Sequence, residues 1–256
     1  MIIVKKKLIF SIGEVWFDEE PDKLSNLDVL YYWHRSQPMQ HTQFQEVYTR
    51  LIDLTKSHDE LWESLSSNDR YKIRRAEKKD GIIYEYWEDI SAKILNEFAD
   101  FYDVFAIQKG LPIINRLKLN NLANAGVFDL SRIKLEDDNS LVWHAHYRNK
   151  NRSFLLNSAS IKNKKDTSFQ SLLGRANRYH HWQDILRFKK SGIPIYDFGG
   201  WYIGNKDEEK LRINEFKQKF GGEIVNNFNC IRGITIKGKL YLALQNMYKK
   251  SITQPN

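Results

Sequence analysis

Two histidines, His144 and His146, stand two residues apart in a run of strand-forming residues. On a strand this spacing places both imidazoles on the same face. A neutral imidazole accepts a proton near pH 7, so the pair could act as a general base. A structural or substrate-orienting role is the alternative. A metal site needs a third ligand, and no partner spacing supplies one, so we expect no metal.

Asp197 follows a short apolar run and precedes Gly199 and Gly200. It is a second candidate for the general base, or a group that binds the acceptor, while a turn-forming aspartate explains it equally well. Some residues of the run Tyr179-His180-His181-Trp182 are expected to pack in the core, and the others to lie at the edge of the site and contact a ligand.

The composition is globular and limits the kinds of partner. The chain has 256 residues, of which 41% are hydrophobic, and a formal net charge of +8. This charge favours an anionic partner such as a coenzyme, a nucleotide sugar, tRNA or a lipid phosphate, although a solubilising surface explains it as well. The single cysteine, Cys230, excludes an intramolecular disulfide and is typical of the cytosol. No apolar run suits a signal peptide or a membrane span, so we expect a cytoplasmic protein.

Hydrophobic periodicity predicts the elements that position these residues. Residues 8–17 and 29–34 are β-like, and a basic helix follows over 59–79, opened by a capping signal at Ser57. From residue 82 the predicted order is strand, helix, helix, three strands, helix, strand, helix and two strands. The predicted ranges are 82–87, 94–110, 115–125, 127–135, 141–147, 153–160, 174–190, 194–198, 207–220, 223–228 and 231–237.

This order of elements and several short segments carry a resemblance to a known family. The segments are Leu61-Trp-Glu-Ser-Leu65 with Arg70-Tyr-Lys-Ile-Arg-Arg-Ala76, His144-Ala-His146, Ser158-Ala-Ser160, Gly174-Arg-Ala-Asn177, Tyr196-Asp-Phe-Gly-Gly200 and Ile213-Asn-Glu-Phe-Lys-Gln-Lys-Phe-Gly-Gly-Glu223. Together they resemble Fem-like acyltransferases of the GNAT superfamily, which are relatives of the enzymes that build peptidoglycan cross-bridges. They also resemble acetyltransferase-like proteins of surface-polysaccharide gene sets. The likeness covers about residues 60–225.

The resemblance implies an α+β GNAT fold, with a mixed, mostly antiparallel sheet and helices on both faces. We expect residues 1–80 to form an N-terminal extension, 81–240 the catalytic domain and 241–256 a tail. The implied reaction is direct: an amine attacks a thioester or ester carbonyl bound between the splayed fourth and fifth strands of the domain. No covalent enzyme intermediate is implied, because Cys230 lies outside the expected site.

The resemblance also implies a coenzyme site near Gly174. GNAT enzymes hold the coenzyme pyrophosphate on a loop patterned Gln/Arg-x-x-Gly-x-Gly/Ala at a helix N-terminus, where unpaired N–H groups favour an anion. Here Ser171-Leu-Leu-Gly174-Arg-Ala176 keeps the glycine and the alanine but begins with serine. An ordinary helix start is the alternative. The expected coenzyme-binding residues are Ser171, Gly174, Arg175, Ala176, Asn177 and Arg178.

Lys217 takes the position where many GNAT enzymes have the tyrosine that protonates the leaving thiolate. Fem-type aminoacyltransferases have a lysine there, and the resemblance implies that its ammonium stabilises the negative tetrahedral intermediate. A solvated surface lysine is the alternative. The expected catalytic residues are Lys217, His144, His146 and Asp197, and the expected substrate-binding residues are Tyr196, Gly199, Gly200, Trp201, Arg70 and Arg74.

The basic helix and the family likeness leave several partners open. Arg70 and Arg74 share one face and could hold tRNA or lipid phosphates, including those of a membrane's inner face, although a solvated face is the simpler account.

The expected donor is acetyl-CoA or another acyl-CoA, and the expected acceptor is the amine of a nucleotide- or lipid-linked amino sugar. One rival uses aminoacyl-tRNA, although the chain is short for two tandem GNAT domains. Another is a non-catalytic domain that binds nucleic acid or a glycan. The oligomeric state is left open.

Overall fold

The computed structural model of the chain describes residues 3–7, 9–21, 24, 26–161 and 166–253. The chain divides into two compact units, which are Met1–Tyr48 with Val225–Asn256 (unit 1) and Thr49–Ile224 (unit 2). Two strands, β4 (Gln43–Asp53) and β10 (Glu223–Gly233), run from one unit into the other. These units differ from the predicted domains, because residues 49–80 belong to unit 2 and not to a separate extension.

Unit 1 combines the two ends of the chain in one sheet. It contains β1 (Ile3–Lys7), β2 (Phe10–Trp16) and β3 (Val29–Arg35), followed in the sheet by the unit's parts of β10 and β4. β1 and β10 pair antiparallel to β2 and β3 respectively, whereas β2 and β3 are parallel. Helix α7 (Ile236–Thr253) packs Leu242 against Ile12 and Val29. The prediction of a second strand at 231–237 and a tail at 241–256 is therefore wrong.

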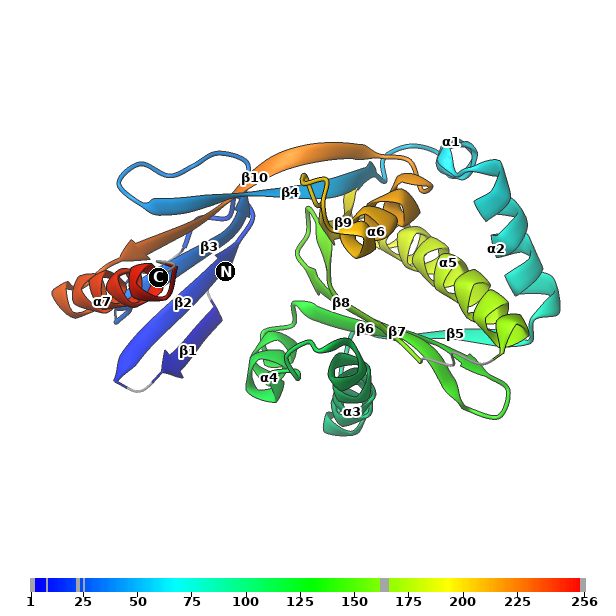
Figure 1. The fold of residues 1–256 in the computed structure, drawn as a ribbon, viewed down its shortest axis with the longest axis horizontal. Coiled ribbons are helices and arrows are strands. Elements are labelled where there is room, and N and C mark those ends of the chain that lie inside the picture. The colour runs from blue at the N-terminus through cyan, green and yellow to red at the C-terminus, as the bar shows by residue number, and fades with distance from the viewer. Residues whose placement is uncertain (1–2, 8, 22–23, 25, 162–165, 254–256) are drawn as a thin grey trace. The chain divides into compact units, whose positions relative to one another are not determined.

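Unit 2 has the predicted GNAT order of elements. Its sheet contains the unit's part of β4, then β9 (Ile195–Gly200), β8 (Ser153–Ser160), β7 (Ser140–Arg148), β6 (Phe128–Leu135) and β5 (Ile82–Trp87). One face of the sheet carries α3 (Ala92–Lys109) and α4 (Arg116–Asn124); the other carries α5 (Thr167–Lys190) and α6 (Glu208–Gln218) (Figure 1). The α+β fold with helices on both faces is thus confirmed.

The alternation of side chains along β7 sorts its residues between the two layers. Trp143 packs its ring against Phe98 of α3. The neighbouring His144 points the opposite way and lies against His180 of α5. The prediction that His144 and His146 share one face is confirmed, since both contact residues on the α5 side.

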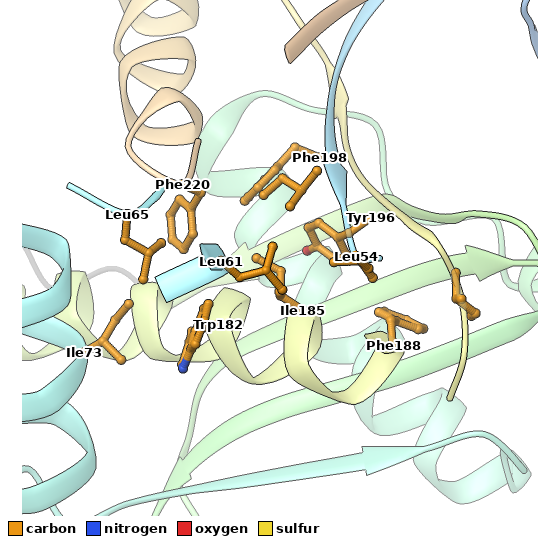
Figure 2. Packing of buried hydrophobic residues seen from close by; sticks show 12 residues of the cluster. Leu54, Leu61, Leu65, Ile73, Trp182, Ile185, Phe188, Tyr196, Phe198 and Phe220 are labelled. Carbon is orange, nitrogen blue, oxygen red and sulfur yellow. The ribbon is translucent and has the colours of Figure 1, made fainter. Parts of the chain in front are cut away.

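One hydrophobic cluster of unit 2 lies around α5 (Figure 2). Helices α1 (His58–Ser64) and α2 (Ser67–Lys79) contribute Leu61 and Ile73, and α5 contributes Trp182. Burying each such side chain stabilises the fold by about 1.5–3 kcal/mol. The predicted single helix over 59–79 is instead two, because Ser66 caps a new N-terminus by accepting a hydrogen bond from the backbone of Asp69. The capping signal at Ser57 is confirmed as a capping box.

Strands β8 and β9 separate soon after they meet. Within the described residues, these parallel strands pair only at Ser153 with Tyr196 and at Phe154 with Asp197. Beyond this point Gly199 has φ +70°, and a Cβ there would lie 2.9 Å from the carbonyl oxygen of Leu155. Glycine is therefore required where the two backbones begin to part. This is the predicted splay between the fourth and fifth strands of the GNAT order.

In the part of the chain that the structure describes, no helix is both long enough and apolar enough to cross a lipid bilayer.

Candidate active site

Lys217 lies on the inner side of α6, with only 9% of its surface exposed. Its Nζ donates hydrogen bonds to the carbonyl oxygens of Gly200 at 2.6 Å and Gly199 at 3.3 Å. One helical turn earlier, Asn214 holds the backbone of Tyr202 by two hydrogen bonds. Together these contacts fix α6 against the end of β9. The alternative of a solvated surface lysine is wrong.

Burial lowers the pKa of Lys217 from 10.5 to about 8, while the negative charge of Asp197 opposes part of this change. At pH 7 the ammonium form therefore still predominates by about ten to one. An ammonium has three N–H donors, and the two carbonyl oxygens occupy two of them. The third N–H is available to a negatively charged oxygen, which such a poorly hydrated cation stabilises strongly.

Asp197 fixes the end of β9 and is completely buried. One of its carboxylate oxygens accepts from the Thr49 hydroxyl and from the N–H of Gly199, and the other accepts from Nε and Nη2 of Arg152. Because both oxygens are occupied, the geometry favours positioning of the backbone over proton transfer. The predicted role of Asp197 as a base stays a prediction.

The other residues predicted to bind substrate near the end of β9 have different surroundings. Gly199 and Gly200 present their carbonyl oxygens to Lys217. The guanidinium of Arg50 lies over the ring of Trp201, with 5.1 Å between Cζ of the arginine and the ring centroid. Arg50 also donates hydrogen bonds to the carbonyl oxygens of Gly221 and Gly222. Tyr196 turns away from Lys217 and is fully buried.

His144 and His146 belong to a sealed polar cluster between β7 and α5. His144 Nδ1 donates to Asp184 Oδ2 at 2.7 Å, and its ring stacks on that of His180 with 3.7 Å between centroids. His146 Nε2 lies 3.4 Å from the hydroxyl of Tyr196. Both histidines have no exposed surface, and burial lowers the pKa of His146 to about 3. Their predicted role as base stays a prediction, and no surface of either ring is open to a substrate.

Asp184 organises this cluster, and sequence reasoning missed it. Its Oδ1 accepts hydrogen bonds of 2.8 Å from the hydroxyls of Tyr84 and Ser131. The available signal was helical spacing: Asp184 follows His180 by four residues, so the two share a helix face. The prediction that no third ligand accompanies the two histidines is therefore wrong, since the ligand atoms of His144, His146 and Asp184 lie within 4.8 Å of one another.

The segment around Gly174 does not begin a helix. Helix α5 begins seven residues earlier at Thr167, after Asp166 caps its first N–H groups. Arg175 pairs with Asp80 at 2.6 Å, and Arg178 pairs with Asp69 at 2.7 Å. The predicted helix start at Gly174 is wrong, which removes the free N–H groups on which the pyrophosphate argument depended. The coenzyme-binding role predicted for the residues around Gly174 stays a prediction; these residues are Ser171, Gly174, Arg175, Ala176, Asn177 and Arg178.

The basic face of α2 has two parts. Arg70 donates to the carbonyl oxygens of Glu63 and Leu65 at the end of α1, and Arg74 lies over the ring of Trp62. These contacts are structural, as expected for a cation at a helix C-terminus. An outer hollow of about 350 Å³ remains exposed and mostly cationic; it is lined by Tyr71, Arg74, Arg75, Lys78 and Lys79.

No family model matches the chain, and no curated protein matches it in sequence. Among solved structures, FemX is 14% identical with a TM-score of 0.66, covering 94% of this chain and 85% of FemX. The C-terminal domain of a putative lysylphosphatidylglycerol synthetase from Agrobacterium fabrum is 11% identical with a TM-score of 0.57, covering 94% and 83%. L-PGS from Bacillus licheniformis is 12% identical with a TM-score of 0.54, covering 97% and 86%. The resemblance to Fem-like GNAT proteins is therefore confirmed at the level of the fold.

Proposed function

We propose that this chain is an acyltransferase that transfers an acyl group from an activated carrier to an amine. The observation that carries the proposal is Lys217, a buried ammonium beside the splay of β8 and β9 that donates to two carbonyl oxygens and has no third acceptor among the described residues. A fold shared with FemX supports it by analogy.

In the proposed reaction the amine nitrogen attacks the donor carbonyl carbon in the splay, and the carbonyl oxygen gains negative charge. Lys217 stabilises that oxygen, while Gly199 and Gly200 hold the ammonium in place. Collapse of the intermediate breaks the carbon–sulfur or carbon–oxygen bond to the carrier, and the proton lost by the amine balances the carrier's negative charge. The Thr49–Asp197–Arg152 network keeps the end of β9 in position.

The proposed donor is acetyl-CoA or another acyl-CoA, and the proposed acceptor is an amino sugar in a nucleotide- or lipid-linked precursor of a cell-envelope glycan. Such a reaction would take place in the cytoplasm, including at the inner face of the membrane.

A second candidate donor, aminoacyl-tRNA, is favoured by one specific observation. The arginines predicted to bind the coenzyme are committed to Asp80 and Asp69. In contrast, the outer hollow of α2 keeps Lys78 and Lys79 exposed, where they could contact a phosphodiester backbone.

A thermal-shift titration separates the two donors. Coenzyme A, acetyl-CoA, deacylated tRNA and aminoacylated tRNA are each added to the protein. For the true donor at about 100 times its Kd, we expect about 2.7 kcal/mol of stabilisation, because ligand binding favours the folded state. Each kcal/mol raises Tm by roughly 2–4 °C in a chain of this size.

Two variants make the titration specific. Arg175→Ala should abolish the coenzyme-dependent shift if the coenzyme binds near Gly174. Lys78→Glu with Lys79→Glu should abolish a tRNA-dependent shift, whereas Lys93→Glu, an exposed lysine of α3, serves as the matched control. Stabilisation by neither ligand, with no acyl transfer to amino sugars, would instead support a non-catalytic binding domain.

A further inference from the structure

Three imidazole nitrogens converge on one carboxylate oxygen in the core of unit 2. Asp184 Oδ2 lies 2.7 Å from His144 Nδ1, 3.7 Å from His146 Nε2 and 3.8 Å from His180 Nε2. All four side chains are completely buried. The nitrogens of His144 and His146 nearest to Asp184 are Nδ1 and Nε2 respectively. The opposite nitrogens, His144 Nε2 and His146 Nδ1, have no partner among the described residues.

The spacing of the ligand atoms fits a tetrahedral metal ion. Zinc–nitrogen and zinc–oxygen bonds of about 2.0–2.1 Å place neighbouring ligand atoms roughly 3.3–3.4 Å apart. The distances of 2.7 Å from His144 and 3.7 Å from His146 to Asp184 lie on either side of this value. To hold an ion, His144 Nδ1 and Asp184 Oδ2 would therefore move apart, and His146 Nε2 and Asp184 Oδ2 would move closer together.

Tyr196 offers a fourth ligand. Its hydroxyl lies 3.4 Å from His146 Nε2, the separation expected between two zinc ligands, and 3.1 Å from Nδ1 of His181. His180 is less suitable, because its ring is parallel to that of His144 within 3° at 3.7 Å. An ion in the plane of one of these rings lies out of the plane of the other.

The supporting contacts also suit a metal. The hydroxyls of Tyr84 and Ser131 hold the other carboxylate oxygen, as the outer contacts of metal ligands do.

We propose that His144, His146, Asp184 and Tyr196 form a structural Zn²⁺ site that joins β7, α5 and β9. On coordination His144 carries its ring proton on Nε2 instead of Nδ1, and the phenol proton of Tyr196 passes to solvent during refolding. The phenolate and the carboxylate of Asp184 then balance the two charges of the ion. The neighbouring Arg187 is already paired with Asp129 at 2.8 Å. This site goes beyond the proposed acyl transfer and does not depend on it.

Metal binding is tested by refolding, because the site is closed to solvent in the folded chain. The full-length protein is unfolded in guanidinium with a chelator and refolded with Zn²⁺, with Co²⁺ or with chelator alone. After removal of free metal, we expect about one ion per chain, visible absorption bands of tetrahedral Co²⁺, and a higher Tm than for the chelator-refolded protein.

Two variants assign the ligands. His146→Gln should bind at least tenfold less metal, and so should Tyr196→Phe, which keeps the buried ring. His58→Gln, at an exposed histidine of α1, should bind as much as the unmodified chain. The proposal is overturned if the unmodified chain refolded with zinc holds less than about a tenth of an ion and has the Tm of the chelator-refolded protein. Unchanged metal content in Tyr196→Phe or in a folded His146→Gln overturns the ligand set.

Discussion

Replacing Lys217 with methionine is expected to reduce the rate of acyl transfer by about 10²–10³-fold, the typical effect of losing one donor to a developing oxyanion. Methionine retains the length of the side chain but cannot donate to the tetrahedral intermediate. The matched control is Lys219→Met, two residues further along the chain and exposed. The comparison is of kcat/KM, with circular dichroism to show that both variants are folded. Near-normal turnover by folded Lys217→Met would remove Lys217 from the mechanism.

The dependence of this rate on pH separates a catalytic from a structural lysine. The reaction needs the ammonium, and the pKa of Lys217 is lowered to about 8, so the rate should fall as the pH rises above 8. Lys217→Arg retains the charge at that pH because a guanidinium stays protonated. Any activity that this variant retains should therefore show no loss between pH 8 and 9. The same decline in both proteins would assign the titration to another group.

The same lowered pKa predicts how stability changes with pH. Between pH 8 and 10.5 the unfolded chain binds a proton at Lys217 that the folded chain does not, so the free energy of unfolding rises with pH. Relative to Lys217→Met, the unmodified chain should gain about 3 kcal/mol across this range. Chemical denaturation of both proteins at several pH values measures the difference between their free energies of unfolding. The titration of the other lysines cancels because both proteins contain them.

Replacing Asp197 with alanine is expected to destabilise the fold by about 3–5 kcal/mol, because the buried guanidinium of Arg152 would lose the carboxylate to which it donates two hydrogen bonds. The Thr49 hydroxyl and the N–H of Gly199 would also lose an acceptor. Asp100→Ala is the control: it removes an exposed ion pair with Arg116, which contributes at most about 1 kcal/mol. Urea denaturation measures both changes.

A double variant tests whether Asp197 acts as a positioning residue. Replacing Asp197 with leucine and Arg152 with methionine removes both charges, so the double variant should be more stable than Asp197→Ala. If Asp197 were instead the general base, the double variant would stay inactive although its free energy of unfolding was restored. Stability and rate measured on the same variants distinguish these roles.

The sequence predicted best the elements whose signals are local. The strand at Ile82–Trp87 and the end of α3 at Gly110 follow from alternation and from a glycine cap, both of which act within a few residues. The predictions failed where contacts with segments far away in the sequence determine the structure. Strand β4 was missed because it pairs with β9, about 150 residues away in the sequence.

The candidate site was likewise predictable only in part from the sequence. The position of Lys217 came from a family pattern, and no periodicity distinguishes it from the neighbouring lysines of α6. The partners that define its surroundings, Thr49 and Arg152, lie on other elements, so only the folded chain brings them to Asp197. The predicted helix start at Gly174 was wrong because a glycine beside small and basic residues resembles the beginning of a helix. In the structure Gly174 lies in the interior of the long helix α5, which tolerates it.

The composition of unit 1 from both ends of the chain has a consequence for biosynthesis. During translation, residues 49–224 leave the ribosome before β10 and α7 exist, so unit 2 can fold while unit 1 still lacks its last strand and its helix. Until then the edge of β3 that pairs with β10 stays open, and an open edge recruits other strands. Premature termination after Ile224 would therefore release a nascent product with a folded unit 2 and an aggregation-prone amino-terminal segment.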